Sequence, residues 1–126
     1  MNLNNFTLKS QEAIQQARQI ALGNGQQSIE CGHLFRGIFN VDENATPFIP
    51  KKLNVNVAVF TKALDKIVGS YPKVTGGEGY LSTRANNAIQ KAISSAKDSE
   101  DEFVSIEHLL LGIFSAGDTI SQLMKD

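Results

Sequence analysis

The chain has 126 residues, enough for one domain and too few for two domains of ordinary size. Its residues are 41% hydrophobic and 20% charged, a globular composition that excludes a disordered or collagen-like chain. Twelve basic and 13 acidic side chains give a net charge of −1, so the overall charge provides no basic surface for nucleic acid or an anionic membrane.

The first half of the chain is predicted to contain three helices. Thr7 can accept a hydrogen bond from the first turn of a helix that the glycines at 23 and 25 end. A second helix is expected over residues 32–39. Pro47 and Pro50 allow at most a short helical turn between residues 42 and 50, and Asn56 can cap a third helix that Gly69 ends. In each helix the apolar residues recur at three- and four-residue spacing, which is typical of a buried helix face.

The second half begins after a linker, residues 71–80, in which three glycines fall within four residues. Ser82 can cap a helix to about residue 97, and Ser105 can cap another over residues 106–114. An acidic loop, residues 98–102, separates these two helices, and a last short helix is expected over residues 119–125. No segment alternates polar and apolar residues for long enough to indicate a strand, so the predicted fold is all-α.

The two halves are copies of one helical unit. When the chain is shifted by 75 residues, residues 6–39 face residues 81–114, and 10 of the 34 pairs are identical. The identities fall in two blocks, as expected for repeated elements separated by a variable loop. They are Ala13/Ala88, Ile14/Ile89, Gln15/Gln90, Ala17/Ala92, Ala21/Ala96, His33/His108, Leu34/Leu109, Gly37/Gly112, Ile38/Ile113 and Phe39/Phe114.

The repeat divides the chain into repeat one (1–70), a glycine-rich linker (71–80) and repeat two (81–126) within one domain. The third helix of repeat one, over residues 53–69, would have its counterpart at residues 128–144, beyond Asp126. Either the second repeat is naturally shorter, or the chain is a fragment whose second repeat is truncated. We favour the fragment.

Few residues of the sequence suggest a nucleotide-binding, metal-binding or catalytic site. The glycine cluster at 76–79 lacks the Lys-Ser/Thr ending of a phosphate-binding loop and follows no predicted strand, so a linker is favoured over a nucleotide site. His33 and His108 occupy equivalent positions without metal-ligand spacing around them, and each is expected to bond backbone or a neighbour. Cys31, the one cysteine, excludes an internal disulfide, indicates a reducing compartment and is expected to be a buried thiol.

Two features suggest binding instead. The acidic loop does not match a calcium loop, and it is either a solvated loop or an attractive patch for a basic or unfolded partner. The seam between the two copies could accept a partner helix or an extended peptide. A small helical enzyme using His33, His108 or Glu107 is a further alternative, which requires a pocket that holds two of these side chains within hydrogen-bonding reach. A free-standing adaptor is another.

Several segments together resemble the Clp N-terminal domain family, whose members precede the ATPase domains of Clp unfoldases. They are Phe6-Thr7-x-x-Ser10-x-Glu12-Ala13, Ile29-Glu30-x-x-His33-Leu34, Tyr71-Pro72-Lys73-Val74 and Ser105-x-Glu107-His108-Leu109-Leu110-Leu111-Gly112. The segment over residues 5–13 is most similar to the ClpB-type disaggregase branch. The resemblance covers nearly the whole chain and implies an all-α domain of two pseudo-twofold repeats, with about seven to eight helices.

The resemblance also implies a function. It implies a non-catalytic domain that recruits unfolded or aggregated polypeptides, or adaptor proteins, to a cytoplasmic, homo-hexameric disaggregase. The alternative is the N-terminal domain of a protease-coupled Clp ATPase that docks an adaptor. Site residues carried over from the family are Thr7, Asp101 and Glu107. No metal or cofactor is expected in this chain, because ATP and magnesium belong to other domains of the parent. Related domains bind phosphoarginine through a glutamate in each repeat; Glu107 keeps that position and Gly32 does not.

Overall fold

The computed structural model describes residues 3–41, 57–74 and 79–116. The described elements follow the order α1 (Leu8–Gly23), β1 (Ser28–Ile29), α2 (Cys31–Val41), α3 (Val57–Gly69), β2 (Tyr80–Leu81), α4 (Thr83–Asp98) and α5 (Ile106–Ser115). The all-α class is confirmed. Five helices lie in the described residues, fewer than the seven to eight expected. The short turn expected between residues 42 and 50, the Asn56 cap, part of the linker and the helix expected over 119–125 lie outside the described residues.

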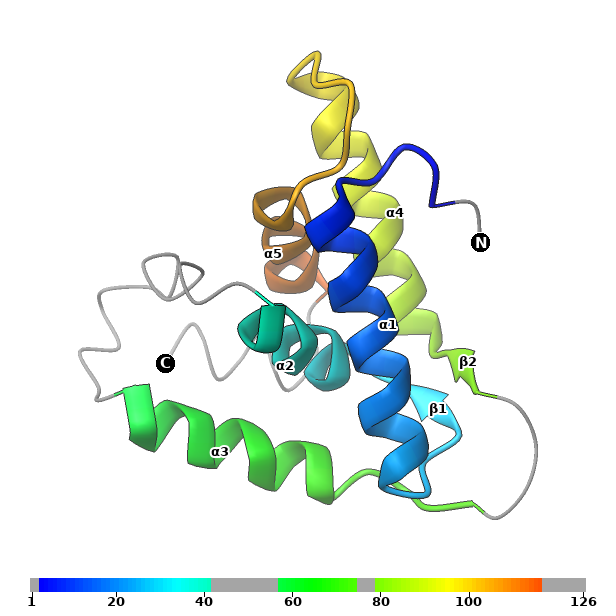
Figure 1. The fold of residues 1–126 in the computed structure, drawn as a ribbon, viewed down its shortest axis with the longest axis vertical. Coiled ribbons are helices and arrows are strands. Elements are labelled where there is room, and N and C mark those ends of the chain that lie inside the picture. The colour runs from blue at the N-terminus through cyan, green and yellow to red at the C-terminus, as the bar shows by residue number, and fades with distance from the viewer. Residues whose placement is uncertain (1–2, 42–56, 75–78, 117–126) are drawn as a thin grey trace.

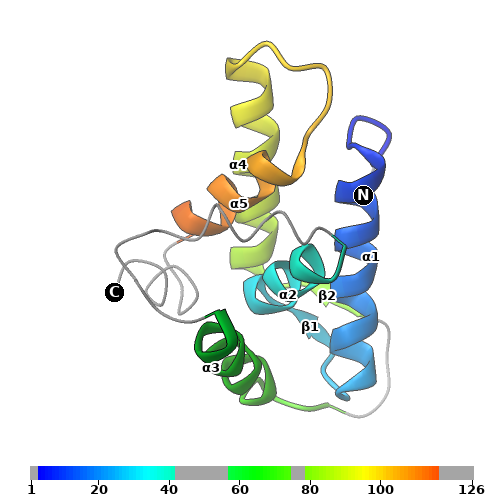
Figure 2. The same cartoon turned by 60° about the vertical axis from the view of Figure 1, so that its left-hand side comes forward.

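The helix bounds repeat at the offset of the sequence repeat. Adding 75 to the bounds of α1 gives those of α4, and adding 75 to the first residue of α2 gives that of α5. In space α1 packs on α2 and α4 packs on α5, while α2 also contacts α3, α4 and α5. Helices α1 and α4 run in opposite directions at the two sides of this core, and α3 lies near the end of the molecule where α1 ends (Figures 1 and 2).

The helices begin where the hydroxyl residues predict. The Thr7 hydroxyl accepts from the backbone N–H of Ser10 at 3.2 Å, and the Ser82 hydroxyl accepts from that of Ala85 at 3.0 Å. Each bond satisfies one of the donors that a first helical turn leaves open. After α1 the chain turns at Gly25, with a φ of 71°, and after α4 at the equivalent Glu100, with a φ of 59°. The same left-handed turn is therefore made once by glycine and once by a residue with a side chain.

Two glycines allow each helix pair to pack closely. A Cβ atom on Gly37 would lie 2.3 Å from the carbonyl oxygen of Ala13, and one on Gly112 would lie 2.0 Å from that of Ala88. Since both distances are far inside van der Waals contact, only glycine fits where α2 crosses α1 and α5 crosses α4. The largest fully buried apolar side chains come from α2, α3, α4 and α5: Phe35, Ile38, Leu64, Ile89 and Ile113.

Short strands tie the repeats together, contrary to the expectation that the chain contains none. Strands β1 and β2 form a parallel pair in which Ile29 faces Leu81. An equivalent parallel bridge joins Phe6 to Val104, at the same offset of 75. Each strand has only two residues. This is too short to show the alternation of polar and apolar residues that predicts a strand from sequence. In both places a residue before the first helix of one repeat pairs with a residue before the second helix of the other.

Candidate binding site

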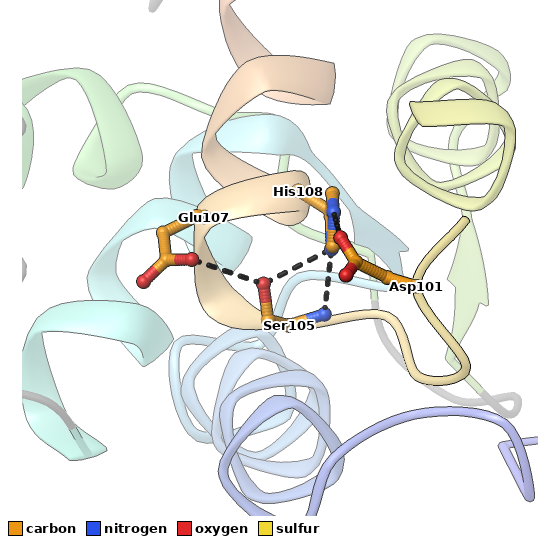
Figure 3. A network of polar contacts seen from close by, with 4 residues as sticks. All are labelled: Asp101, Ser105, Glu107 and His108. Atoms are coloured by element: carbon orange, nitrogen blue, oxygen red, sulfur yellow. Dashed lines mark hydrogen bonds and ion pairs between the residues drawn. The ribbon is translucent and has the colours of Figure 1, made fainter. Parts of the chain in front are cut away.

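Two of the three predicted site residues, Asp101 and Glu107, lie where the loop after α4 meets the start of α5. Hydrogen bonds connect them through Ser105 and His108 (Figure 3). We call these four residues the α5 N-terminal site. Asp101 and Glu107 are exposed, and His108 is buried apart from its edge. The two carboxylates therefore present negative charge to solvent, while a part-buried hydrogen bond to His108 holds Asp101 and an exposed one to Ser105 holds Glu107.

His108 fixes the loop to the helix. Its Nδ1 accepts the backbone N–H of Ser105 at 3.0 Å, and its Nε2 lies 3.0 Å from Oδ2 of Asp101. Because Nδ1 is an acceptor, the proton of the neutral imidazole is on Nε2, which donates to the carboxylate. The imidazole thereby completes one half of a capping box and holds Asp101 beside the helix start.

Glu107 lies in the first turn of α5, where the helix dipole favours an anion. Its Oε2 is 3.5 Å from the Ser105 hydroxyl, a long and exposed contact. Within the described residues no cation pairs with Glu107. Its charge is consequently available to a partner.

Thr7 lies beside this site. Its backbone N–H donates to the carbonyl of Val104 at 3.0 Å, so the start of α1 is fixed next to the segment that leads into α5. Its hydroxyl donates to the Ser10 hydroxyl at 2.9 Å and accepts from the Ser10 backbone, and is thus already used in the cap of α1. The structure places all three predicted residues at one end of the molecule, with Thr7 in a supporting position.

Repeat one has the same histidine arrangement in a buried form. His33 Nδ1 accepts the backbone N–H of Glu30 at 2.9 Å, and its Nε2 lies 2.7 Å from Oε1 of Gln26. Gln26 is the counterpart of Asp101 at the offset of 75. His33 is fully buried, and this burial lowers its pKa to about 4 although the Glu30 carboxylate acts in the opposite direction. Both histidines bond backbone and a neighbour, as predicted.

The segment after α3 covers the repeat-one counterpart. The Gln26 amide donates to the carbonyl of Val68 at 2.7 Å and to that of Tyr71 at 3.3 Å. The Tyr71 ring lies 5.1 Å from the His33 ring, and its hydroxyl would be 2.6 Å from a Cβ atom on Gly32. A side chain at position 32 would therefore require Tyr71 to shift, so the observed position of the Tyr71 ring goes together with glycine at position 32. No local sequence pattern predicts this contact.

Two shallow pockets open around the loop before α5, and both are lined by Asp101 and Glu102. The first, about 230 Å³, is also lined by Asn5, Ile93, Ala96, Lys97 and Val104. The second, about 290 Å³, is lined by Phe103 and three members of the α5 N-terminal site as well. Ile93 is 36% exposed and Phe103 is 46% exposed, so apolar surface lies next to the carboxylates. This combination suits a chain that offers both apolar and basic side chains.

The arrangement does not favour catalysis. The second pocket brings Glu107 and His108 together, but in the described part of the chain no hydrogen bond joins these two side chains. Ser105, His108 and Asp101 form a line similar to a catalytic triad. However, the Nδ1 lone pair that would accept the serine proton already accepts the Ser105 backbone N–H. The Cys31 thiol is fully buried, as predicted.

Within residues 3–41, 57–74 and 79–116, no cluster of three or more candidate ligands could hold a metal ion. In the same ranges, no helix combines the length and the apolar character that crossing a membrane requires.

The fold is thus a duplicated helical domain with a polar site at one end, and comparison with known proteins identifies its family. A family model described as the Clp repeat (R) N-terminal domain matches residues 5–126. The chain belongs to this family. Over all of its length it is 47% identical to the chaperone protein ClpB of Bacteroides thetaiotaomicron and 40% identical to that of Porphyromonas gingivalis. It spans 15% of the length of each of these relatives.

Solved structures agree with this assignment at the level of the fold. The N-terminal domain of Hsp104 from Candida albicans matches with a TM-score of 0.84 and 17% identity, over 97% of this chain and 81% of that one. The N-terminal domain of the chaperone ClpD from Arabidopsis thaliana matches with a TM-score of 0.71 and 17% identity, over 98% and 84%.

Proposed function

We propose that this domain recruits unfolded or aggregated polypeptide, or an adaptor that carries it, to a ClpB-type disaggregase. The main observation that supports this proposal is that exposed carboxylates lie beside exposed apolar side chains at the α5 N-terminal site. The identity to ClpB chaperones over the full chain supports the choice of parent. In this proposal the parent is a cytoplasmic homo-hexamer, its other domains bind ATP and magnesium, and this domain binds without catalysing.

Each group of the site has a part in the proposed interaction. Apolar side chains of an unfolded segment would cover Ile93 and Phe103, which gains the free energy of removing apolar surface from water. Basic side chains of the segment would pair with Asp101 and Glu107. Charges at the rim of an interface act mainly on the association rate, so this pairing would accelerate capture and weaken with salt.

The test measures binding of reduced, carbamidomethylated lysozyme, an unfolded and basic chain, by surface plasmon resonance at low and high salt. We expect Glu107→Gln and Asp101→Asn each to weaken binding about threefold at low salt, with a smaller difference at high salt. Glu12→Gln, which removes an exposed negative charge on α1, is the matched control and is expected to bind like the wild type.

Thr7 requires its own control, because Thr7→Ala removes a helix cap as well as a residue beside the site. Ser82→Ala removes the equivalent cap of α4. If binding falls in Thr7→Ala and persists in Ser82→Ala at matched stability, the position of Thr7 matters. If all variants of the α5 N-terminal site bind like the wild type while circular dichroism shows them folded, this site is not the recruitment surface.

A further inference from the structure

We propose that a second groove, between α1, α2 and α3, binds acidic polypeptide segments in which carboxylate side chains alternate with apolar ones. We call it the α2–α3 groove. Its volume is about 360 Å³, and six of its lining residues carry the argument: Ile20, Arg36, Asn40, Asp65, Val68 and Lys73. It lies near the end of α1, where Ile20 follows Thr7 by 13 residues and is about 20 Å from it along the helix at a rise of about 1.5 Å per residue. It is therefore separate from the α5 N-terminal site.

The groove has an apolar floor with polar groups around it. Val68 is buried and Ile20 is half-buried, so an apolar side chain placed here would cover carbon rather than displace hydrogen bonds. Grooves with an apolar floor and a small number of polar groups are typical ligand sites.

Two cationic side chains, Arg36 and Lys73, line the groove, and most of their N–H groups have no acceptor among the described residues. The Arg36 Nε atom lies 3.4 Å from Oδ1 of Asp65, which occupies one edge of the guanidinium. In the part of the chain that the structure describes, its terminal nitrogens bond no acceptor, and the side chains of Asn40 and Lys73 make no polar contact either. A guanidinium edge of this kind accommodates a carboxylate with two parallel hydrogen bonds.

Charge selects an acidic occupant. Arg36 and Lys73 contribute two positive charges to the groove and Asp65 contributes one negative charge, so the lining carries a net charge of +1. The Arg36 side chain is 31% exposed, so it is shielded enough for a carboxylate contact to contribute more than an ordinary surface ion pair. A segment that suits this groove would be repelled by the carboxylates of the α5 N-terminal site. The two ends of the domain thus select opposite partners.

The internal repeat shows that the fold does not require these donors. At the offset of 75, Arg36 corresponds to Leu111 and Asn40 corresponds to Ser115. Helix α5 forms and packs on α4 in the same way with a leucine that is 52% exposed at this position. The donors of the groove are therefore an addition of repeat one rather than a condition of the helix pair.

The test is a titration of the ¹⁵N-labelled chain followed by amide chemical shifts. The probe is an N-acetylated, C-amidated hexapeptide of alternating glutamate and leucine, and its control replaces glutamate by glutamine. We expect saturable shifts at the amides of Asn24, Asn40 and Gly69, which line the groove. The glutamine peptide is expected to bind about tenfold more weakly, as loss of a charge-assisted bond implies.

Three variants decide the result. Arg36→Leu copies the residue that repeat two carries and is expected to weaken binding about tenfold. Lys73→Gln, an exposed change that leaves the core intact, is expected to weaken it about threefold and serves if Arg36→Leu fails to fold. Lys91→Gln makes the same charge change on α4 and is expected to bind like the wild type.

The proposal is overturned if the groove amides do not shift at millimolar peptide, or if the glutamine peptide binds as well. It is equally overturned if the groove amides shift with protein concentration alone, because the occupant is then a second copy of this chain. None of these outcomes depends on whether the α5 N-terminal site binds unfolded chains, so the two proposals can fail separately.

Discussion

The burial of His33 should make the stability of the domain fall between pH 7 and pH 5. In the folded state the pKa of His33 is lowered to about 4, whereas an unfolded chain has an ordinary histidine pKa near 6.5. Between these values the unfolded state binds more protons than the folded state. Stability therefore rises with pH through this window and is lost as the pH falls.

The magnitude follows from the same two values. At pH 5 the unfolded imidazole is almost fully protonated and the folded one is almost neutral, a separation of about 1.5 pH units. At 1.36 kcal/mol per unit, the free energy of unfolding should fall by about 2 kcal/mol relative to pH 7. The absence of solvent-exposed surface on His33 agrees with the direction of this change. Ordinary carboxylates titrate mostly below pH 5 and contribute little in this range.

The assay is urea unfolding followed by circular dichroism, since the chain has no tryptophan. The wild type is compared with His33→Gln at both pH values, and the loss should be smaller in the variant. An NMR titration of the folded protein measures the pKa of His33 directly. The chain has only two histidines, so in the His108→Asn variant the one remaining histidine signal is that of His33. A His33 signal that titrates near pH 6.5, or equal losses in both proteins, would refute the reasoning.

Two further predictions concern backbone positions. Gly112→Ala should lower the free energy of unfolding by about 2 kcal/mol, because the new Cβ would lie 2.0 Å from the Ala88 carbonyl oxygen and overpacking outweighs the gain in helix propensity. Gly23→Ala, where a Cβ meets nothing within 4 Å, is the control in urea unfolding, and equal stability of the two variants would contradict the close crossing. Glu100→Gly should raise stability by about 0.5 kcal/mol, since relief of the left-handed strain exceeds the extra chain entropy of glycine. A lower urea midpoint would contradict this.

The sequence predicted most of the described helices because their signals are local. Thr7, Ser82 and Ser105 each precede a helix, and the offset of 75 relates the two helix pairs. The predicted bounds differ from the observed ones by one or two residues, as for α2, which begins at Cys31 rather than at residue 32. Capping chemistry and apolar spacing act over a few residues, so one sequence is enough to read them.

The features that were missed depend on contacts distant in sequence. The Tyr71 ring over Gly32 and the Phe6–Val104 bridge leave no local pattern. The pairings of His108 with Asp101 and of His33 with Gln26 are related by the offset of 75, but the paired residues Asp101 and Gln26 differ in type. A comparison of identities alone therefore does not find them.

The crossed strand pairing bears on how such a duplicated domain could arise. Ile29 pairs with Leu81, and Phe6 pairs with Val104, so each copy supplies one partner to both ladders. A single ancestral copy would carry both partners and could make the same two contacts with a second chain, as an isologous homodimer does. Duplication of that gene and fusion of the two copies would then turn a concentration-dependent association into an intramolecular one. After fusion the two copies no longer have to be identical. A surface position can then change in one copy alone, as at Arg36 of repeat one and the equivalent Leu111 of repeat two.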